Sequence, residues 1–458
     1  MCIIKLIWNK SNKKNDKKVN MLEGSLWDKI LIVALPFAFT GIMQQLFNAA
    51  DIAMLGQFVG KEAMAAVGSN SPIIAMVLSL FIGVSLGANV VIARFIGKKN
   101  IHGVHAAVHT AILVALGSGV VMTILGEIAA APLLRALLVP DEIFDMSVLY
   151  LRIFLLGMPV ILLYNFESSI FRSQGDTRTP LYCLIVSGVV KFFLNLFFIL
   201  VLDMSVEGVA IGTVVASTIS SGLLFYFLCR STTDIRVHLQ DFHVDKRILM
   251  PMLRIGLPAG VQGMVFALSN LCIQSAINGL GPDVMAASAA AFNVEIFIFF
   301  IVNAFGQVCT TFVSQNYGAR KLDRCKQVLK WCLVQDIIIG VACGAFVYAF
   351  GIPILSIFNS DAAVIAYGMI RVTYVGCLEV IESLIDVFSG AMRGYGSSLI
   401  PALITLFGIC GTRIAWVYTV FSWEPDFETL MMVFPISWGV SAVILIAAYQ
   451  WFVKHLRA

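Results

Sequence analysis

Residues 284–314 read VMAASAAAFNVEIFIFFIVNAFGQVCTTFVS, an apolar run in which Glu295 is the single charged side chain. A helix of about 20 apolar residues crosses the hydrocarbon core of a bilayer, so this run is long enough to span a membrane with some tilt. Backbone groups inside lipid must bond within their own segment, which favours helices. Comparable runs occupy residues 29–55, 64–93, 104–126, 145–170, 180–202, 207–228, 253–277, 328–350, 363–390, 399–421 and 430–452. We therefore predict an all-α polytopic membrane protein with twelve transmembrane helices.

The composition supports a membrane protein. Of the 458 residues, 59% are hydrophobic and 13% are charged, about half the charged fraction of a typical soluble domain. Most of the ten cysteines fall inside apolar runs without metal-type spacing, so we predict neither a metal site nor a disulfide. The sequence shows no nucleotide-binding loop, catalytic Ser/His/Asp set or nucleic-acid patch. We therefore expect no enzyme activity, no nucleic-acid partner and no cofactor besides a coupling ion.

The Lys and Arg residues are distributed unevenly among the loops. With the N-terminus inside, most of the 31 fall in cytoplasmic segments, whereas the opposite loops hold Lys61 and Arg135. Positive residues mark the cytoplasmic side, so we expect both termini in the cytoplasm and the chain in the inner (cytoplasmic) membrane. Residues 1–20 are expected to be disordered or an upstream extension, with Met21 as the more ordinary start. The predicted parts are a cytoplasmic N-terminal segment (1–28), an N-lobe (29–228), a cytoplasmic linker (229–250), a C-lobe (251–453) and a cytoplasmic C-terminus (454–458).

The two halves of the chain repeat. Three separate features recur at offsets of 221 or 222 residues: Leu35-Pro36 with Leu257-Pro258, Gly97 with Gly318, and Arg172, Gly175 and Pro180 with Arg393, Gly396 and Pro401. Each half holds an even number of spans, so both halves enter the membrane from the same side. The pattern predicts two pseudo-symmetric six-helix bundles around a central cleft, an arrangement typical of transporters that work by alternating access.

Four motifs carry a family resemblance. They are LPFAFTGIMQQLFNAADIAMLG (35–56), GVSLGANVVIARFIGKKN (83–100), SSIFRSQGDTRTP (168–180) and SGAMRGYGSSLIP (389–401). Together they resemble the MATE family of the MOP flippase superfamily, over residues 21–455. The resemblance implies a multidrug efflux antiporter that exports amphipathic, often cationic compounds in exchange for inward flow of H⁺ or Na⁺.

The resemblance also implies a cation-coupling site. Asp51 matches the acidic residue of the family's first span, Asn195 the asparagine of its fifth span and Thr213 the threonine of its sixth. Many members carry a second aspartate where this chain has Ile199, which removes one carboxylate that Na⁺ would need. Another branch carries a glutamate where this chain has Phe266 and a span-ten acid near Glu382. We therefore expect H⁺ rather than Na⁺ as the coupling ion.

Carboxylates in mid-span are functional candidates, because each costs about 2.5–3.5 kcal/mol on insertion scales. We expect Asp51 to be the protonatable switch, although a solvated position near the outer interface would also explain it. Glu295 is expected in the cleft, coupling a proton or binding a cationic drug; the alternative is a structural partner for Lys191 or Arg413. Further acids lie on one face of the tenth span, namely Glu379, Glu382 and Asp386.

Within that group, we assign Glu382 to coupling and Glu379 to substrate binding, and expect Asp386 to pair with Arg371 or Arg413. Lys191, Arg413 and Asp386 are expected in structural ion pairs.

Two polar residues and two prolines complete the predicted set. Gln44 resembles a substrate-contacting glutamine of the family, and Asn165 is a further substrate-binding candidate. Pro36 and Pro258 each remove one backbone hydrogen bond and could act as hinges. The alternative is a proline in the first turn of a helix.

Two rival functions remain. A lipid-linked oligosaccharide flippase of the same superfamily needs a basic cleft for its pyrophosphate, and an integral membrane enzyme needs a catalytic pair at one depth. The mid-span charges lean acidic, which favours small cationic or amphipathic substrates. We expect membrane lipids as the remaining partners and a monomer as the functional state.

Overall fold

The computed structural model describes residues 19–238 and 240–456, and within these ranges the ordered elements are helical. The prediction that residues 1–20 are disordered or an extension falls almost entirely outside the described residues. Eleven described helices are long and apolar enough to cross a membrane, and up to twelve if one bent pair is a single span. The prediction of an all-α polytopic membrane protein is therefore confirmed.

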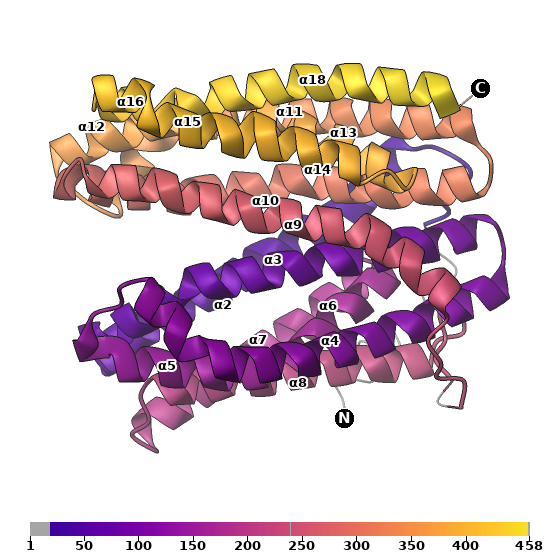
Figure 1. Cartoon of the computed structure of the whole chain (residues 1–458), viewed down its shortest axis with the longest axis horizontal. Coiled ribbons are helices and arrows are strands. Elements are labelled where there is room, and N and C mark those ends of the chain that lie inside the picture. Colours follow the sequence, from indigo (N-terminus) through magenta and orange to yellow (C-terminus); the bar gives the residue numbers. More distant parts are fainter. Residues whose placement is uncertain (1–18, 239, 457–458) are drawn as a thin grey trace. The chain divides into compact units, whose positions relative to one another are not determined.

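The first eight described helices run from the N-terminal part of the chain to residue 278 (Figure 1). They are α2 (Trp27–Phe58), α3 (Lys61–Gly97), α4 (Ile101–Ala136), α5 (Asp141–Leu156), α6 (Met158–Ser173), α7 (Arg178–Leu200), α8 (Val206–Cys229) and α9 (Lys246–Asn278).

The remaining elements are drawn from orange to yellow in Figure 1. They are α10 (Pro282–Gly318), α11 (Leu322–Ser356), α12 (Ala362–Arg371), the π-helix η2 (Val372–Gly376), α13 (Glu379–Gly394), α14 (Leu399–Thr405), the π-helix η3 (Leu406–Gly411), α15 (Thr412–Tyr418), α16 (Val420–Trp423), α17 (Phe427–Met431) and α18 (Val433–Leu456).

The chain divides into two compact units. Unit 1 contains residues Phe39–Leu253, and unit 2 contains Met21–Ala38 together with the chain from Arg254 onward. Helix α2 therefore begins in unit 2 and continues in unit 1, and the division falls two residues after Pro36. The second division falls four residues before Pro258, inside α9.

The span predicted at 145–170 is broken. Helices α5 and α6 meet at Gly157 with a bend of 51°. Pro159 follows in the first turn of α6 and cannot donate to the preceding turn, so a continuous helix is disfavoured there. Gly157 also packs tightly on α8, because a Cβ atom at this position would lie 2.5 Å from Val214 Cγ2. The break is thus fixed by both local chemistry and packing.

The segment that leads into α2, and the first residue of α2, are bound to the rest of unit 2 by hydrogen bonds to backbone carbonyls. Asn316 Nδ2 and Arg324 Nε both donate to the Met21 carbonyl, at 3.1 and 3.2 Å. Gln335 Nε2 donates to the carbonyl of Trp27 at 2.6 Å, and the Trp27 ring packs edge-on against Trp331. The first turns of α2 are therefore held firmly within unit 2.

Residues 230–245 lie between α8 and α9, where the sequence predicts a linker. This segment is held on α4 in unit 1. The backbone N–H of His238 donates to His109 Nε2 at 3.1 Å, and that of Asp245 donates to Thr110 Oγ1 at 3.2 Å. The polar segment is thus packed against a helix by specific contacts.

Glycines bring α10 and α13 into close contact in unit 2. A Cβ atom at Gly390 would lie 2.2 Å from the Gly306 carbonyl oxygen, and one at Gly306 would lie 2.9 Å from that of Asp386. Small residues allow two helix backbones to approach in this way. The contact fixes the register in which polar side chains of α10 and α13 face each other.

Candidate functional site

Asp51 is buried in unit 1 and forms an ion pair. It is 6% exposed, and Lys191 Nζ donates to its Oδ2 at 2.5 Å. Asn195 Nδ2 donates to its Oδ1 at 2.8 Å. The alternative that Asp51 is merely solvated near the interface is wrong, because both carboxylate oxygens are bound by protein groups. Lys191 is part of the Asp51 site.

Two glycines position this triad. One turn before Asp51, the Phe47 ring lies over Gly188, where a Cβ atom would be 2.0 Å from the ring. That contact brings α2 close to α7 at the level of Lys191. On α8, a Cβ atom at Gly212 would lie 2.0 Å from Asn195 Oδ1. The amide of Asn195 is therefore confined between Asp51 and α8.

The surroundings of the triad are apolar. Ile199, which stands where many family members have an aspartate, is 5% exposed and belongs to a hydrophobic cluster with Met54, Leu55 and Val209. Tyr150 of α5 belongs to the same cluster and lies close enough to Asp51 to interact electrostatically. Ile199 therefore contributes packing at a position where a second carboxylate would have supplied ligands.

The other residues predicted for unit 1 make local contacts. Thr213 Oγ1 donates to the carbonyl of Val209 one turn earlier, and Asn165 Nδ2 donates to that of Ile161. Gln44 is exposed on α2. The described contacts thus join Asn195, but not Thr213, to the Asp51 carboxylate.

Glu295 is bound by an arginine of unit 2 that was not its predicted partner. Arg371 Nε donates to Glu295 Oε2 at 2.9 Å and Arg371 NH2 to Oε1 at 3.2 Å, a two-pronged ion pair. Arg371 NH1 also donates to Ser288 Oγ at 2.6 Å. The expected structural partners, Lys191 and Arg413, are engaged elsewhere.

Arg413 lies in an aromatic enclosure. Its guanidinium carbon is 4.3 Å from the Phe434 ring centroid and 5.1 Å from that of Phe266, and the group is fully buried. Its NH1 donates to Asn270 Oδ1 at 2.9 Å. Glu382 is its main electrostatic partner, yet no ion pair within 4 Å joins them among the described residues. Arg413 is therefore stabilised mainly by aromatic faces and an amide.

The acids of α13 have different environments. Glu379 is 3% exposed, with Oε2 lacking a hydrogen-bond partner, and it neighbours Glu382 one turn on. Asp386 accepts a hydrogen bond from Asn303 Nδ2 of α10, where the sequence predicts an ion pair. The helix thus presents two acids toward Arg413 and one toward α10.

Two buried acids escaped the site prediction. Glu167 of α6 is fully buried and accepts from Ser221 Oγ at 2.9 Å. Asp336 of α11 is also fully buried, and neither of its oxygens has a hydrogen-bond partner. Both were detectable, because each is a carboxylate inside an apolar run of the kind that pointed to Asp51 and Glu295.

Pro36 and Pro258 both lie inside long helices. Pro36 is in the third turn of α2, and Pro258 is deeper still in α9. The alternative of a proline in the first helical turn is wrong for both. Among the described residues, no group of three or more His, Cys, Asp or Glu side chains could hold a metal ion.

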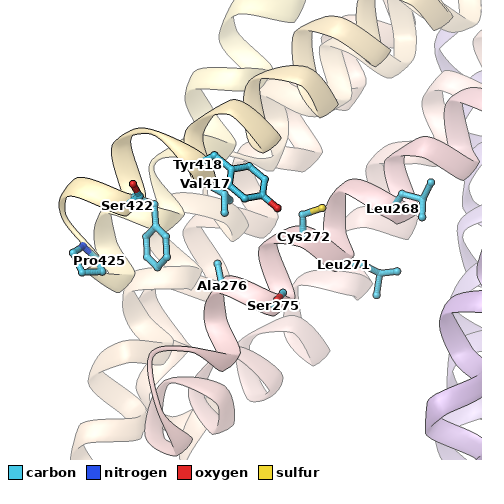
Figure 2. A pocket seen from close by; sticks show the side chains of 10 residues that line it. Leu268, Leu271, Cys272, Ser275, Ala276, Val417, Tyr418, Ser422 and Pro425 are labelled. Carbon is cyan, nitrogen blue, oxygen red and sulfur yellow. The ribbon is translucent and has the colours of Figure 1, made fainter. Parts of the chain in front are cut away.

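Unit 2 also has a groove of about 600 Å³ between α9 and the α15–α16 segment (Figure 2). Tyr418 and Cys272 point toward one another across it, and Leu268, Val417 and Pro425 supply apolar walls. Its lining residues carry no charge, so it could accommodate an apolar or aromatic group but could not neutralise a cation.

Comparison with known proteins identifies relatives along nearly the whole chain. The family model MatE matches residues 36–197 and 258–419, one match in each half. The probable multidrug resistance protein YoeA of Bacillus subtilis is 28% identical over 444 residues, which cover 93% of this chain and 94% of YoeA. The probable multidrug resistance protein NorM of Thermotoga maritima is 27% identical over 406 residues, 84% of each chain.

A solved structure has the same fold. It is described as the outward-facing conformation of a multidrug resistance MATE family transporter of the MOP superfamily. It superposes with a TM-score of 0.89 at 22% identity and covers 96% of this chain and 99% of its own.

Proposed function

Because the chain belongs to the MatE (MATE) family of multidrug efflux transporters, we propose that it exchanges protons, rather than Na⁺, for amphipathic, often cationic compounds. MATE proteins are multi-pass membrane transporters and not enzymes, so the chemistry to explain is the coupling of two fluxes. The relatives' names support multidrug export as the class of substrate. Small organic compounds are accordingly the partners.

The observation that carries the proposal is the ion pair between Lys191 and Asp51. The Lys191 ammonium donates to one carboxylate oxygen and the Asn195 amide to the other. A metal cation at this carboxylate would have to displace the ammonium and find further oxygens, yet Ile199 offers none. A proton needs only one carboxylate oxygen.

Protonation of Asp51 supplies a physical switch. It would neutralise the acid and end the ion pair, leaving Lys191 as a buried, uncompensated charge. Removing one partner of a buried pair typically costs about 3–5 kcal/mol. An energy of that size is sufficient to shift a two-state equilibrium between conformations by more than a hundredfold. We propose that this is how proton binding at Asp51 selects the state that releases cargo.

The remaining predicted roles are retained as proposals. Glu295, Glu379 and Glu382 of unit 2 would bind cationic cargo or further protons, with Gln44 and Asn165 as polar contacts and Thr213 near the coupling site. Pro36 and Pro258 would serve as hinges. We further propose a monomer in the cytoplasmic membrane, in contact with lipid and with both termini in the cytoplasm, in line with the Lys and Arg distribution.

Reconstituted transport tests the coupling ion. Proteoliposomes loaded with ethidium are given either a pH gradient or a Na⁺ gradient of equal size. We expect the pH gradient alone to drive efflux, and Asp51→Asn to abolish it, whereas the exposed loop variant Glu424→Gln retains it. Efflux that requires the Na⁺ gradient and ignores the pH gradient would overturn the proposal. Scrambling of a fluorescent lipid without drug movement would favour the flippase.

A further inference from the structure

Unit 2 contains a buried acid that the proposed exchange does not use. Asp336 lies in α11 without solvent exposure, and both of its carboxylate oxygens lack hydrogen-bond partners. Helix α11 packs against α10 and α13, so protein surrounds the carboxyl group. An isolated carboxylate in such surroundings costs several kcal/mol even after relaxation, so its charge must be compensated or absent.

The neighbours of Asp336 on α13 do not supply that compensation. Ser383 lies beside it and interacts with the carboxyl group, but its hydroxyl donates to the Val380 carbonyl at 2.8 Å and carries no charge that could neutralise an acid. Asp386, also on α13, faces Asp336 with a like charge. Asp386 is itself bound by the Asn303 amide of α10. The site therefore brings two carboxyl groups together from α11 and α13.

The other titratable groups around the site are thiols, one arginine and Glu382, which lies one turn before Asp386 on α13 and interacts with it electrostatically. Cys332 on α11 is fully buried next to Asp336, and Cys309 on α10 is fully buried next to Cys332. Arg393 interacts electrostatically with Asp386, while its NH2 donates to Gln262 Oε1 at 2.7 Å. No described basic side chain forms an ion pair with Asp336. Arg393 is thus the one base that interacts with Asp386, and no described base is paired with Asp336.

We propose that Asp336 and Asp386 form a proton-binding site in unit 2, in which Asp336 carries the proton. Two neighbouring carboxyl groups in a largely buried site disfavour the ionisation of both without a second counter-charge. Asp386 has the Asn303 amide as a donor and Arg393 nearby, whereas Asp336 has neither a donor nor a paired base, so we assign the proton to Asp336. A proton requires a single oxygen, whereas a metal cation requires a shell of them, and the Ser383 hydroxyl is already committed to the backbone. Asp386 is partly exposed and offers the fully buried Asp336 a route for proton exchange.

The repeat shows that this site is not part of the duplicated scaffold. At an offset of 221 residues, Ala115 stands in unit 1 where Asp336 stands in unit 2, and Asn165 stands where Asp386 stands. Ala115 is fully buried, so the same position is filled with an apolar side chain in one unit and an acid in the other. The site exists independently of the exchange proposed at Asp51; only its use in transport rests on that proposal.

Infrared difference spectroscopy of the purified full-length protein in nanodiscs tests the site without transport. The spectrum of wild type minus Asp336→Asn at neutral pH should contain one protonated-carboxyl stretch and no carboxylate bands. Wild type minus Asp51→Asn should show the reverse, because Asp51 is paired with Lys191. Glu424→Gln, an exposed acid, provides the reference for an ionised carboxylate.

Two results would overturn the assignment. The first is a carboxylate band, with no protonated-carboxyl band, in the wild type minus Asp336→Asn spectrum. The second is a rise in melting temperature of the wild type on adding NaCl, relative to choline chloride, that disappears in Asp336→Asn, since this identifies Na⁺ as the occupant. A fold defect is recognised separately, because Asp336→Asn should retain the wild-type melting temperature within a few degrees if the acid is already neutral.

A transport measurement then tests whether the proton at Asp336 is exchanged during ethidium export. The number of protons taken up per ethidium exported should fall by one in Asp336→Asn, while a pH gradient still drives efflux through Asp51. If wild type shows no proton-driven efflux at all, the proposal at Asp51 fails, but the infrared result still decides whether Asp336 binds a proton.

Discussion

Unit 1 and unit 2 carry the same motifs 221 or 222 residues apart, yet their buried charges are arranged differently. At an offset of 222, Lys191 of unit 1 corresponds to Arg413 of unit 2, whereas Asp51 corresponds to the apolar Ile273. A basic residue is thus present at this position in both units, but the acid that pairs with it, Asp51, is present only in unit 1. In unit 2 the acids come from α10, α11 and α13.

The consequence is a difference in how charge is compensated. In unit 1, Lys191 binds Asp51 directly at 2.5 Å. In unit 2, Arg413 is held among aromatic rings, and Glu295 is bound by Arg371, which lies on another helix. The two units therefore share sequence motifs but differ in the chemistry of their buried charges. We infer that the two units have separate roles, with the most sensitive coupling step in unit 1.

The largest effect is expected from separating the partners in unit 1. Asp51→Asn should abolish proton-driven ethidium efflux and lower the stability of the protein by about 3–5 kcal/mol, because Lys191 is left buried and unpaired. The double variant Asp51→Asn/Lys191→Met should recover most of the stability but none of the coupled efflux. Thermal unfolding in detergent and efflux from proteoliposomes provide the two readouts.

The single and double variants distinguish a purely stabilising role of the Asp51–Lys191 ion pair from a role of Asp51 in proton coupling. If the double variant recovered efflux, the ion pair would be a structural feature and Asp51 would not be the switch. If the single variant were as stable as wild type, Lys191 would have another partner. Displacement of its ammonium from Asp51 would then not disfavour a metal cation at this site.

The corresponding change in unit 2 should have a smaller effect on transport. Glu295→Gln removes the partner of Arg371 and should cost about 3 kcal/mol of stability. Glu295→Gln/Arg371→Met should restore stability, and because we place the coupling step in unit 1, efflux should remain within about tenfold of wild type, or about 1.4 kcal/mol. Complete loss of efflux in this stable double variant would make Glu295 indispensable for coupling, rather than one of several acids that bind cargo, and would remove the distinction between the units.

A glycine substitution sharpens the geometry of the unit 1 site. Gly212→Ala places a methyl group 2.0 Å from Asn195 Oδ1, so the amide must move away from Asp51. We expect a loss of about 1–3 kcal/mol in stability from overpacking and a drop of about tenfold in efflux. Gly222→Ala on the same helix meets nothing within 4 Å and should behave like wild type. Equal behaviour of the two variants would show that the position of Asn195 does not matter.

The fold was predictable from the sequence because spans and repeats are properties of apolar length and of motif spacing. The run at 284–314 lies within α10 (Pro282–Gly318), and the pair of family matches repeats as the motifs do. The bend at Gly157 was missed, although the Gly157-Met158-Pro159 sequence indicates a helix break within that span.

The site was less predictable, because the partner of a buried charge depends on helix rotation. The sequence identified Asp51 and Asn195 by resemblance, and Lys191 as a member of an ion pair. It could not show that Lys191 reaches Asp51, a contact that depends on Phe47 packing over Gly188. The pairing of Glu295 with Arg371 likewise depends on how α10 packs against α12. Asp336 was the one acid in its span and could have been selected by the same reasoning as Asp51.

The smallest effect is expected at the two prolines, where the units again differ. Pro36 lies two residues before the point at which α2 passes from unit 2 to unit 1, whereas Pro258 lies four residues past the corresponding point in α9. Replacing a proline within a helix restores one backbone hydrogen bond and stiffens it. Pro36→Ala and Pro258→Ala should therefore unfold at the same or a slightly higher temperature than wild type.

Both variants should bind ethidium with unchanged affinity, while their turnover falls a few-fold. The fall should be larger for Pro36→Ala, because Asn316, Arg324 and Gln335 hold the chain at and just before the start of α2. Fluorescence titration measures the affinity for ethidium, and efflux rates at saturating ethidium measure turnover. An unchanged turnover in Pro36→Ala would show that α2 does not flex at this proline.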